Sequence, residues 1–334
     1  MKCSICKSSA AIYFRRNEGI ALCADCLIWN LENKVRRTVS KYDMLKPADR
    51  IAVAISGGKD SLSLLKILSK LTAKFPRCEL FAVMVDEGIR GYRDRILSDA
   101  KAFCEILGIP WAVVSFKELY GLALDEMLAA RPGENPCSYC AVLRRKALNN
   151  AARVLKADKL ALAHNLDDVV QTFLLNLMLG DPDRALRALS PVSPRAPGAV
   201  PRIKPLFRIP EKELALYAYL NGIPIPSSAC PYGDRALRND VRAALNLLEL
   251  GHPGIKYSIL RSAQSLASLA ECPSGGGTGI CRVCGGPSSG DICRACAIAE
   301  GNWRRDIAVG HPGAPRANPR SAQARSPPSA GAGP

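Results

Sequence analysis

The sequence has no long hydrophobic run. Its apolar stretches, such as residues 51–55, are far shorter than the roughly 18 residues that a membrane-spanning helix requires. No secretory signal precedes the first cysteine, Cys3. These absences argue against a membrane or secreted protein, so we expect a cytoplasmic protein without a membrane partner.

Acidic residues are scarce relative to basic ones. The 334-residue chain has 30 Asp and Glu against 46 Lys and Arg, so its formal net charge is +16 and its pI is about 9.4. Such a charge attracts polyanions, and nucleic acid is the leading candidate partner, with a basic surface that has no such partner as the alternative. The hydrophobic fraction of 48% is that of a folded protein, and the length predicts one main domain with smaller modules.

Cysteine, in contrast, is abundant, and its fourteen residues fall mostly in CxxC pairs. Two close pairs separated by a short loop present four thiolates tetrahedrally to one zinc ion. The chain has two such sets: Cys3, Cys6, Cys23 and Cys26, and then Cys281, Cys284, Cys293 and Cys296. We therefore predict two structural Zn²⁺ sites, which would supply folding energy that such small modules lack. Paired disulfides are the alternative, and an intracellular compartment disfavours them.

A third group of cysteines is smaller. Cys137 and Cys140 form a CxxC pair, and Cys230 stands far downstream, before Pro231. Three thiolates are too few to close a tetrahedral structural site, so they would hold a metal or cluster with one open coordination position, where chemistry can occur. A CxxC pair with an unrelated buried cysteine is the alternative.

Between the outer cysteine sets, strand-like and helix-like stretches alternate. The predicted strands are residues 50–55, 80–85, 111–116 and 159–163, and the predicted helices include residues 62–74 and 92–107. This alternation predicts an α/β fold with a doubly wound, mostly parallel sheet, flanked by two small zinc-binding modules. Ligands bind such sheets at the carboxyl ends of the strands, so the residues that follow each strand are the candidates for a site.

The first predicted strand is followed by the loop Ser56-Gly57-Gly58-Lys59-Asp60-Ser61 and then by a helix. Glycines let the backbone approach a ligand, and a helix amino terminus with nearby donors forms a phosphate cradle. Asp60 would orient Mg²⁺ beside the phosphates. The loop is not the GxxxxGK[ST] type of the common NTPases. It is similar to the loop of the PP-loop ATP pyrophosphatases, which adenylate a carbonyl oxygen and release pyrophosphate.

The last predicted strand is followed by His164-Asn165-Leu166-Asp167-Asp168, which opens another helix. Carboxylates at a helix start can serve as caps alone. Two adjacent acids with a histidine at the end of a strand also indicate a nucleotide or magnesium site, and both interpretations stay open.

Taken together, these motifs resemble the tRNA 2-thiolation branch of the PP-loop superfamily. Its members have an amino-terminal zinc finger, SGGKDS, a CxxC pair, GHNxDD, a later Cys-Pro-Tyr and a carboxyl-terminal zinc finger, and the match runs from residue 1 to about residue 296. Within the branch, residues 86–93, 140–145 and 179–181 look more like the group that thiolates the anticodon wobble uridine than the group that thiolates the T-loop methyluridine.

The resemblance implies a set of site residues. Cys137, Cys140 and Cys230 match the three ligands of a [4Fe–4S] cluster whose fourth iron has no protein ligand. The implied catalytic residues are Asp60, Arg144, Asp168, Cys140 and Cys230. The implied ATP contacts are Ala54, Ile55, Ser56, Gly57, Gly58, Lys59, Asp60, Ser61, Met84, Arg144, Ala163, His164 and Asp168. Two positions depart from the family pattern: Ala163 replaces the glycine before His164, and many relatives have lysine where this chain has Arg144.

The implied activity is that of an ATP-dependent tRNA 2-thiouridine synthase, a sulfurtransferase with tRNA as its substrate. The sulfur donor would be a ubiquitin-like protein thiocarboxylate or sulfide, and a homodimer is allowed because relatives often dimerise. A version without a cluster would carry a persulfide on Cys140 or Cys230. The alternatives are the same reaction at the T-loop and a non-catalytic tRNA-binding subunit.

Two basic segments are candidates for contact with the tRNA backbone. Lys34, Arg37 and Lys41 share one face of a predicted helix, for which a solvated face is the alternative. The second segment contains Arg202, Lys204 and Arg208 in a proline-rich stretch.

We expect six segments along the chain. They are a zinc finger at 1–30, a basic linker helix at 31–46, the PP-loop catalytic domain at 47–225, a helical segment with Cys230 at 226–275, a second zinc finger at 276–300 and a disordered tail at 301–334.

Overall fold

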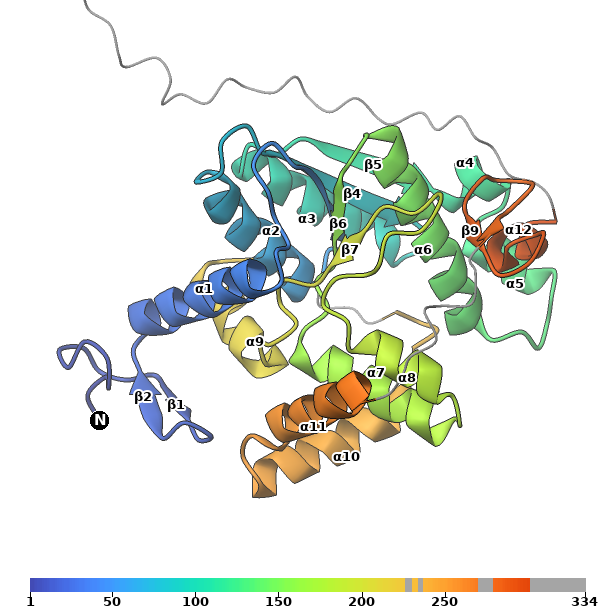
Figure 1. The fold of residues 1–334 in the computed structure, drawn as a ribbon. Helices are drawn as coiled ribbons and strands as arrows, with labels where there is room; N and C mark the ends of the chain where they lie inside the picture. The colour runs from blue at the N-terminus through green and yellow to red at the C-terminus, as the bar shows by residue number, and fades with distance from the viewer. Residues whose placement is uncertain (226–229, 234–236, 270–278, 301–334) are drawn as a thin grey trace, which may run out of the picture.

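The computed structural model describes residues 1–225, 230–233, 237–269 and 279–300. Its centre is a five-stranded parallel sheet with the strand order β5-β4-β3-β6-β7 (Figure 1). The strands are β3 (Arg50–Ile55), β4 (Glu79–Asp86), β5 (Trp111–Ser115), β6 (Lys159–Ala161) and β7 (Arg202–Ile203). The order runs outward in both directions from β3 and β6, so the predicted doubly wound α/β fold is confirmed.

Both faces of this sheet are buried. In β3, Ile51 and Val53 pack into one core whereas Ala52 packs into another, because successive side chains point to opposite faces. The first face is covered by α1 (Ala24–Lys41), α2 (Lys59–Thr72), α3 (Arg93–Ile106) and α9 (Glu211–Leu220). The second face is covered by α4 (Phe116–Tyr120), α5 (Leu124–Ala129) and α6 (Pro136–Val154). Burial on both sides explains why the central strands are apolar along most of their length.

Four further helices form a bundle with its own apolar core (Figure 1). They are α7 (Leu166–Met178), α8 (Pro182–Ala188), α10 (Leu237–Gly251) and α11 (Ile255–Leu269). Helix α7 begins shortly after β6, so the bundle stands at the carboxyl end of the sheet. In the described part of the chain, no helix has the length and apolar character needed to cross a bilayer.

The N-terminal cysteine module, residues 1–26, consists of the antiparallel hairpin β1 (Tyr13–Arg15) and β2 (Ile20–Leu22) and the first turn of α1. A buried ion pair attaches it to the main domain. The Arg15 guanidinium donates two hydrogen bonds to the Glu213 carboxylate on α9, at 2.6 and 2.8 Å, and both side chains are 1% exposed. Arg15 also donates to Glu18 and to Asn30. The pair therefore links the hairpin to a helix that packs on α2.

The C-terminal cysteine module, residues 279–300, packs against α6 at the other side of the molecule (Figure 1). It consists of β8 (Gly279–Ile280), β9 (Pro287–Ser288) and α12 (Arg294–Ile298). Arg131 donates to the Ile298 carbonyl oxygen at 2.9 Å. Gly198 approaches so closely that an added Cβ would lie 2.5 Å from the Gly285 carbonyl oxygen. Backbone contact at this point requires a residue without a side chain.

The strands and helices predicted within residues 50–163 are present, with boundaries that differ by up to three residues. The basic linker helix predicted at 31–46 is part of α1, which begins at Ala24 and ends at Lys41. The strand predicted at 159–163 ends at 161, because the chain turns there towards the amino end of α7. Strand β7 has only two residues and was not predicted. It is recognised by its pairing with β6, because its amino-acid composition is not typical of a strand. The tail predicted from residue 301 lies outside the described residues.

Removal of Glu213 should destabilise the protein strongly. Glu213→Ala removes the carboxylate of the buried ion pair, whereas the Arg15 guanidinium stays buried. Breaking a buried pair in this way lowers the free energy of unfolding by about 3–5 kcal/mol. The double variant Arg15→Met/Glu213→Leu should lose less, because no charge remains unpaired. Urea denaturation of the metal-loaded chain measures both. Equal losses for the two variants would contradict a role for the unpaired charge.

Candidate functional site

The site lies where the strand order reverses, between β3 and β6. These strands pair in parallel, with Ile51 opposite Lys159, so their carboxyl ends lie side by side. The segment after β3 leads into α2, and the segment after β6 leads into α7. Crevices of this kind are the usual ligand sites of doubly wound sheets. The structure therefore brings the two motifs predicted from the sequence to one place.

The glycine-rich loop is held in shape by its own hydroxyl groups. Ser56 donates to Ser61 Oγ at 3.2 Å, and Ser61 in turn donates to the Gly58 carbonyl oxygen at 2.9 Å. Gly57 has a φ of +83°, and an added Cβ would lie 2.2 Å from Ile96 Cγ2. Any side chain at this position would both strain the backbone and clash with α3. The loop therefore depends on glycine at position 57.

A cavity of about 300 Å³ opens above this loop. Most of the residues predicted to contact ATP line it: Ala54, Ile55, Ser56, Gly58, Lys59, Asp60, Ser61, Arg144, Ala163, His164 and Asp168. Gly57 shapes the loop without lining the cavity. Met84 is fully buried in the core and does not line the cavity, so its contact with a nucleotide stays a prediction.

Two carboxylates, Asp60 and Asp168, line the cavity close to the phosphate loop. Burial raises the pKa of Asp60 to about 6, and Asp168 and Glu211 add to the rise. Burial also raises the pKa of Asp168. Asn165 Nδ2 donates to Asp60 Oδ2 at 3.1 Å, whereas Asp60 Oδ1 is buried without a hydrogen-bond partner among the described residues. An unsatisfied carboxylate oxygen beside a second acid fits a magnesium ion.

Lys59 is the cation closest to these acids. Its Nζ lies 2.9 Å from Glu211 Oε1 and 3.4 Å from Asp60 Oδ1. Glu211 is the first residue of α9, and the Asp167 carboxylate accepts from its backbone N–H at 2.8 Å. Two carboxylates thus hold Lys59 at the phosphate loop, where it lines the cavity. When ATP binds, a phosphate can replace one of these carboxylates as the partner of Lys59.

Asp168 has a structural role as well. It forms a capping box with Asn165: the Asp168 N–H donates to Asn165 Oδ1 at 2.9 Å, and the Asn165 N–H donates to Asp168 Oδ2 at 3.2 Å. Its other oxygen, Oδ1, lies 3.8 Å from an Arg238 nitrogen. The capping interpretation of the HNLDD motif and the site interpretation are therefore both compatible with the structure, because one oxygen caps α7 and the residue also lines the cavity.

Glu87 connects the phosphate loop to the cysteine helix α6. Its two carboxylate oxygens lie 2.7 Å from Arg93 Nε and 2.7 Å from Arg144 Nε. These are close ion pairs whose two Nε–H groups are not aligned for hydrogen bonds. Arg93 also donates to the carbonyl oxygens of Ser56 and Val85, and Arg144 donates to Cys140 Sγ at 3.0 Å. One carboxylate, 1% exposed, therefore positions both arginines.

Glu87 and Arg93 were not among the site residues predicted from the sequence. Glu87 directly follows β4, so the rule that placed the candidates after β3 and β6 applies to it equally. Arg93 belongs to α3 and reaches back to the loop.

The third cysteine group gathers beside Arg144. Cys137 and Cys140 lie in the first two turns of α6, and the segment 230–233 folds against them, with Cys137 Sγ donating to the Tyr232 carbonyl oxygen at 3.5 Å. Cys230 packs against the same core cluster as Cys140. Burial raises the pKa of Cys140 to about 11, with Arg144 opposing the rise.

The three sulfurs of this group do not share the close spacing of the two four-cysteine groups, in which all sulfurs lie within 4.8 Å of one another. A [4Fe–4S] cluster places several irons between its thiolates, so its ligands stand farther apart than the ligands of one ion. A wider spacing of the three sulfurs is therefore compatible with a cluster.

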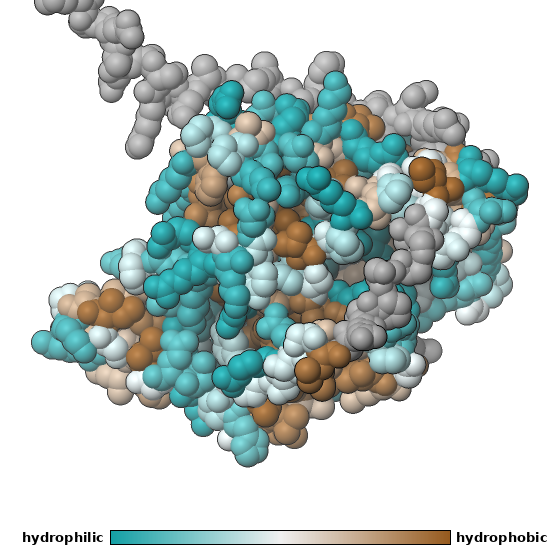
Figure 2. Space-filling view, in the orientation of Figure 1, coloured by the Kyte–Doolittle hydropathy of each residue, from teal (hydrophilic) through white to brown (hydrophobic). Residues whose placement is uncertain are grey.

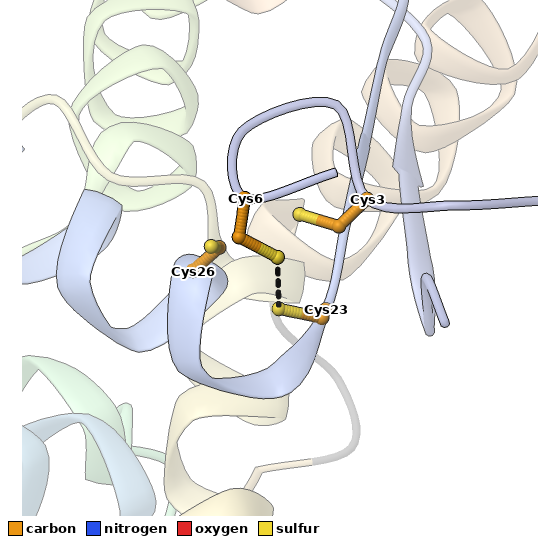
Figure 3. A group of neighbouring side chains, drawn as sticks. All are labelled: Cys3, Cys6, Cys23 and Cys26. Atoms are coloured by element: carbon orange, nitrogen blue, oxygen red, sulfur yellow. Dashed lines mark hydrogen bonds between the residues drawn. The ribbon is translucent and has the colours of Figure 1, made fainter. Parts of the chain in front are cut away.

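The two four-cysteine groups have the spacing of single-ion sites. In the N-terminal module, Cys3 and Cys6 come from the loop before the hairpin, and Cys23 and Cys26 from the start of α1; the four sulfurs face one another (Figure 3). Cys6 Sγ lies 3.9 Å from Cys23 Sγ, and Cys284 Sγ lies 3.7 Å from Cys293 Sγ. A tetrahedral zinc with Zn–S bonds of about 2.3 Å sets its sulfurs roughly 3.8 Å apart. Both groups can hold Zn²⁺.

Basic side chains surround the mouth of the cavity. His164 reaches solvent but stands in a concave surface, and the surrounding protein together with Lys204 and Arg238 lowers its pKa to about 4. Burial and Arg202 lower the pKa of Lys204 to about 8. His164 is therefore neutral at pH 7, and the field at the mouth favours anionic ligands.

The chain is similar to known proteins over most of its length. A family model described as a PP-loop domain matches residues 30–248. The chain is 35% identical to the "Cytoplasmic tRNA 2-thiolation protein 1" of Danio rerio, over 90% of this chain and 88% of that protein. It is 35% identical to the "tRNA 2-thiolation protein NcsA" of Haloferax volcanii, over 90% of this chain and 98% of that protein.

A solved structure is similar over nearly the same span. It is the U34-tRNA thiolase NcsA from Methanococcus maripaludis with its [4Fe–4S] cluster, with 39% sequence identity and a TM-score of 0.79. The match covers 90% of this chain and 96% of that chain.

Substitution of Glu87 should weaken ATP binding. Glu87→Gln keeps the shape of the side chain but removes the charge that holds Arg93 and Arg144 together, so we expect affinity for an ATP analogue to fall about 10-fold or more and the melting temperature to drop. Glu79→Gln, at the exposed start of the same strand, is the matched control and should change neither. Calorimetric titration measures the binding. Wild-type affinity in Glu87→Gln would contradict a positioning role.

The raised pKa of Asp60 predicts a cost to folding that depends on pH. Because the folded-state pKa of about 6 exceeds the ordinary value of 3.8, ionised Asp60 lowers stability above pH 6, and the cost shrinks as the pH falls from 6 towards 4. Asp60→Asn should therefore raise the melting temperature of protein free of nucleotide and magnesium more at pH 8 than at pH 5. Asp99→Asn, an exposed substitution on α3, is the control. A melting temperature for Asp60→Asn below that of the wild type at pH 8 would disprove that ionised Asp60 lowers the stability.

Proposed function

Because the chain belongs to the PP-loop family of tRNA 2-thiolation proteins, we propose that it is an ATP-dependent sulfurtransferase that replaces the C2 oxygen of a tRNA uridine by sulfur. The observation that carries this proposal is the convergence of the phosphate loop, the acids of the HNLDD motif and the three-cysteine group, with Arg144 lining the cavity and contacting Cys140.

The first half of the proposed reaction activates the uracil. Its O2 attacks the α-phosphate of ATP, the bond to the β-phosphate oxygen breaks, and pyrophosphate leaves. The loop residues Ser56 and Lys59, together with Arg144, stabilise the charge that develops on the phosphates. Magnesium, when bound, would neutralise part of the triphosphate charge. Asp60 and Asp168 are the residues that would hold it.

The second half exchanges the leaving group for sulfur. A sulfur nucleophile adds at C2, and AMP departs with the original oxygen, so the poor leaving group oxide is avoided. The [4Fe–4S] cluster, when bound through Cys137, Cys140 and Cys230, would supply an open coordination site that holds sulfide. Arg144 holds Cys140 on the side that faces the nucleotide cavity. A persulfide on Cys140 or Cys230 is the version without a cluster.

We propose the anticodon wobble uridine as the position modified. The support is the name of the Methanococcus maripaludis structure, a U34-tRNA thiolase, together with its 39% identity over most of both chains. Mass mapping of tRNA from a deletion strain tests this choice, since loss of sulfur at the T-loop would point to the other group. We further propose a cytoplasmic location, two structural Zn²⁺ ions, and a donor that is sulfide or a ubiquitin-like protein thiocarboxylate. A homodimer is the proposed assembly.

Two variants should separate the two half-reactions in anaerobically purified protein. Asp60→Ala should lower tRNA-dependent pyrophosphate release by at least about 10²-fold, because the magnesium ion that would balance the charge of the phosphates loses a ligand. Cys230→Ser should retain most of the pyrophosphate release but lose thiolation and bound iron.

Cys78→Ser is the matched cysteine control, because Cys78 donates only to the Lys46 carbonyl oxygen and a serine can do the same. Pyrophosphate assay, iron analysis and nucleoside mass spectrometry provide the readouts. Full thiolation without iron in the wild type would reject the cluster. No pyrophosphate release with tRNA present would favour a non-catalytic binding subunit.

A further inference from the structure

A second and larger cavity lies outside the ATP site. It is a groove of about 820 Å³ between α1 and α11, and none of the residues that line it also lines the nucleotide cavity. Figure 2 shows hydrophilic side chains over α1. Thr38, Tyr257 and Leu260 contribute to its walls. We call it the α1–α11 groove.

Contacts at its ends fix the separation of the two helices. At one end, Arg16 donates to the Leu250 carbonyl oxygen at 2.9 Å, and Gly254 packs on Asn17. At the other end, Gln264 Nε2 lies 3.4 Å from Tyr42 Oη in a hydrogen bond. The α1–α11 groove is therefore a feature held open by the packing of the N-terminal cysteine module on the helical bundle, and it is formed before any ligand binds.

The lining carries an excess of positive charge. Five cations line the α1–α11 groove: Lys34, Arg37, Lys41, Arg208 and Arg261. Glu18 is the carboxylate among the lining residues, and it is already paired with Arg15 and Lys34. Among the described residues, no carboxylate lies within ion-pair distance of Arg37, Lys41, Arg208 or Arg261. Their charges are available to an external anion.

The chemistry of the α1–α11 groove fits a phosphodiester backbone better than a protein. Protein interfaces place buried aromatic or aliphatic anchors at their centre, whereas Leu260 here is 2% exposed and offers almost no apolar surface. Several cations in a row, without pockets that accommodate a nucleotide base, are typical of contacts that position nucleic acid through its phosphates.

The groove is also linked to the ATP site through the chain. Arg208 lies three residues before Glu211, the first residue of α9, and Glu211 binds Lys59. In between, the Ile209 carbonyl oxygen accepts from the Leu166 N–H of α7 at 3.0 Å. A ligand held by Arg208 would thus be fixed relative to the starts of α7 and α9.

We propose that the α1–α11 groove binds the tRNA phosphate backbone away from the uridine that reacts, so that the N-terminal cysteine module and α11 together hold the substrate in register. This proposal rests on the proposed function, because it takes tRNA as the substrate. It adds α11 and Arg261 to the tRNA contacts predicted from the sequence, and it brings Arg208 of the second basic segment together with the basic stripe on α1.

The test uses direct binding of a full-length tRNA transcript to the intact chain, which requires no turnover. Arg37→Glu/Arg261→Glu should weaken binding at least about 10-fold near 0.15 M salt and reduce the slope of log affinity against log salt by about 2. Both side chains are exposed and lack ion pairs, so the melting temperature should not change. Arg37→Gln/Arg261→Gln, which removes charge without reversing it, should weaken binding less.

Lys74→Glu/Arg77→Glu is the matched control, because these exposed cations follow α2 at the opposite end of the sheet from the site. It should bind tRNA as the wild type does. If the groove variant also binds tRNA normally, the groove proposal is overturned while pyrophosphate release still supports the proposed function. Normal tRNA affinity with reduced thiolation would assign the groove to a protein partner instead. A wild-type chain that binds no tRNA would overturn both proposals.

Discussion

The site depends on one buried carboxylate that holds two arginines together. Two guanidinium groups repel each other, and in this protein they converge only because Glu87 lies between Arg93 and Arg144. Through Arg93 the carboxylate reaches the carbonyl oxygen of Ser56 in the phosphate loop, and through Arg144 it reaches the sulfur of Cys140. The loop that would hold ATP and the helix that would hold the cluster therefore share a single support. A displacement of α6 would therefore shift the phosphate loop, although the two segments are more than 70 residues apart in the sequence.

The cavity also combines charges of both signs. Burial raises the pKa values of the acids Asp60 and Asp168, and Lys59, Arg93 and Arg144 line the same cavity. A magnesium–nucleotide complex likewise carries a cation and negative phosphates, so both kinds of side chain have a partner in it. The scarcity of acidic residues in the whole chain thus has a local counterpart: carboxylates are retained where a cation is needed, and the surrounding surface stays basic.

Much of this architecture could be predicted from the sequence, because strand periodicity and the loop after the first strand are local signals. The parallel sheet, the meeting of the SGGKDS and HNLDD motifs and the two cysteine groups at single-ion spacing follow from such signals. Glu87 was missed because its role depends on two arginines elsewhere in the chain. Met84 is buried in the core and does not line the cavity, so its contact with ATP stays a prediction. The α1–α11 groove depends on packing between segments some 220 residues apart, which no local pattern indicates.

The C-terminal cysteine module covers α6, yet it is encoded after almost everything else in the fold. With synthesis at about 5–20 residues per second, the ribosome would extrude α6 roughly ten seconds before its cover. Throughout that interval the surface of α6 that the module covers in the finished protein stays open to solvent or a chaperone. The timing of translation, and not only the final packing, thus sets how long this surface of the helix with Cys137 and Cys140 stays uncovered.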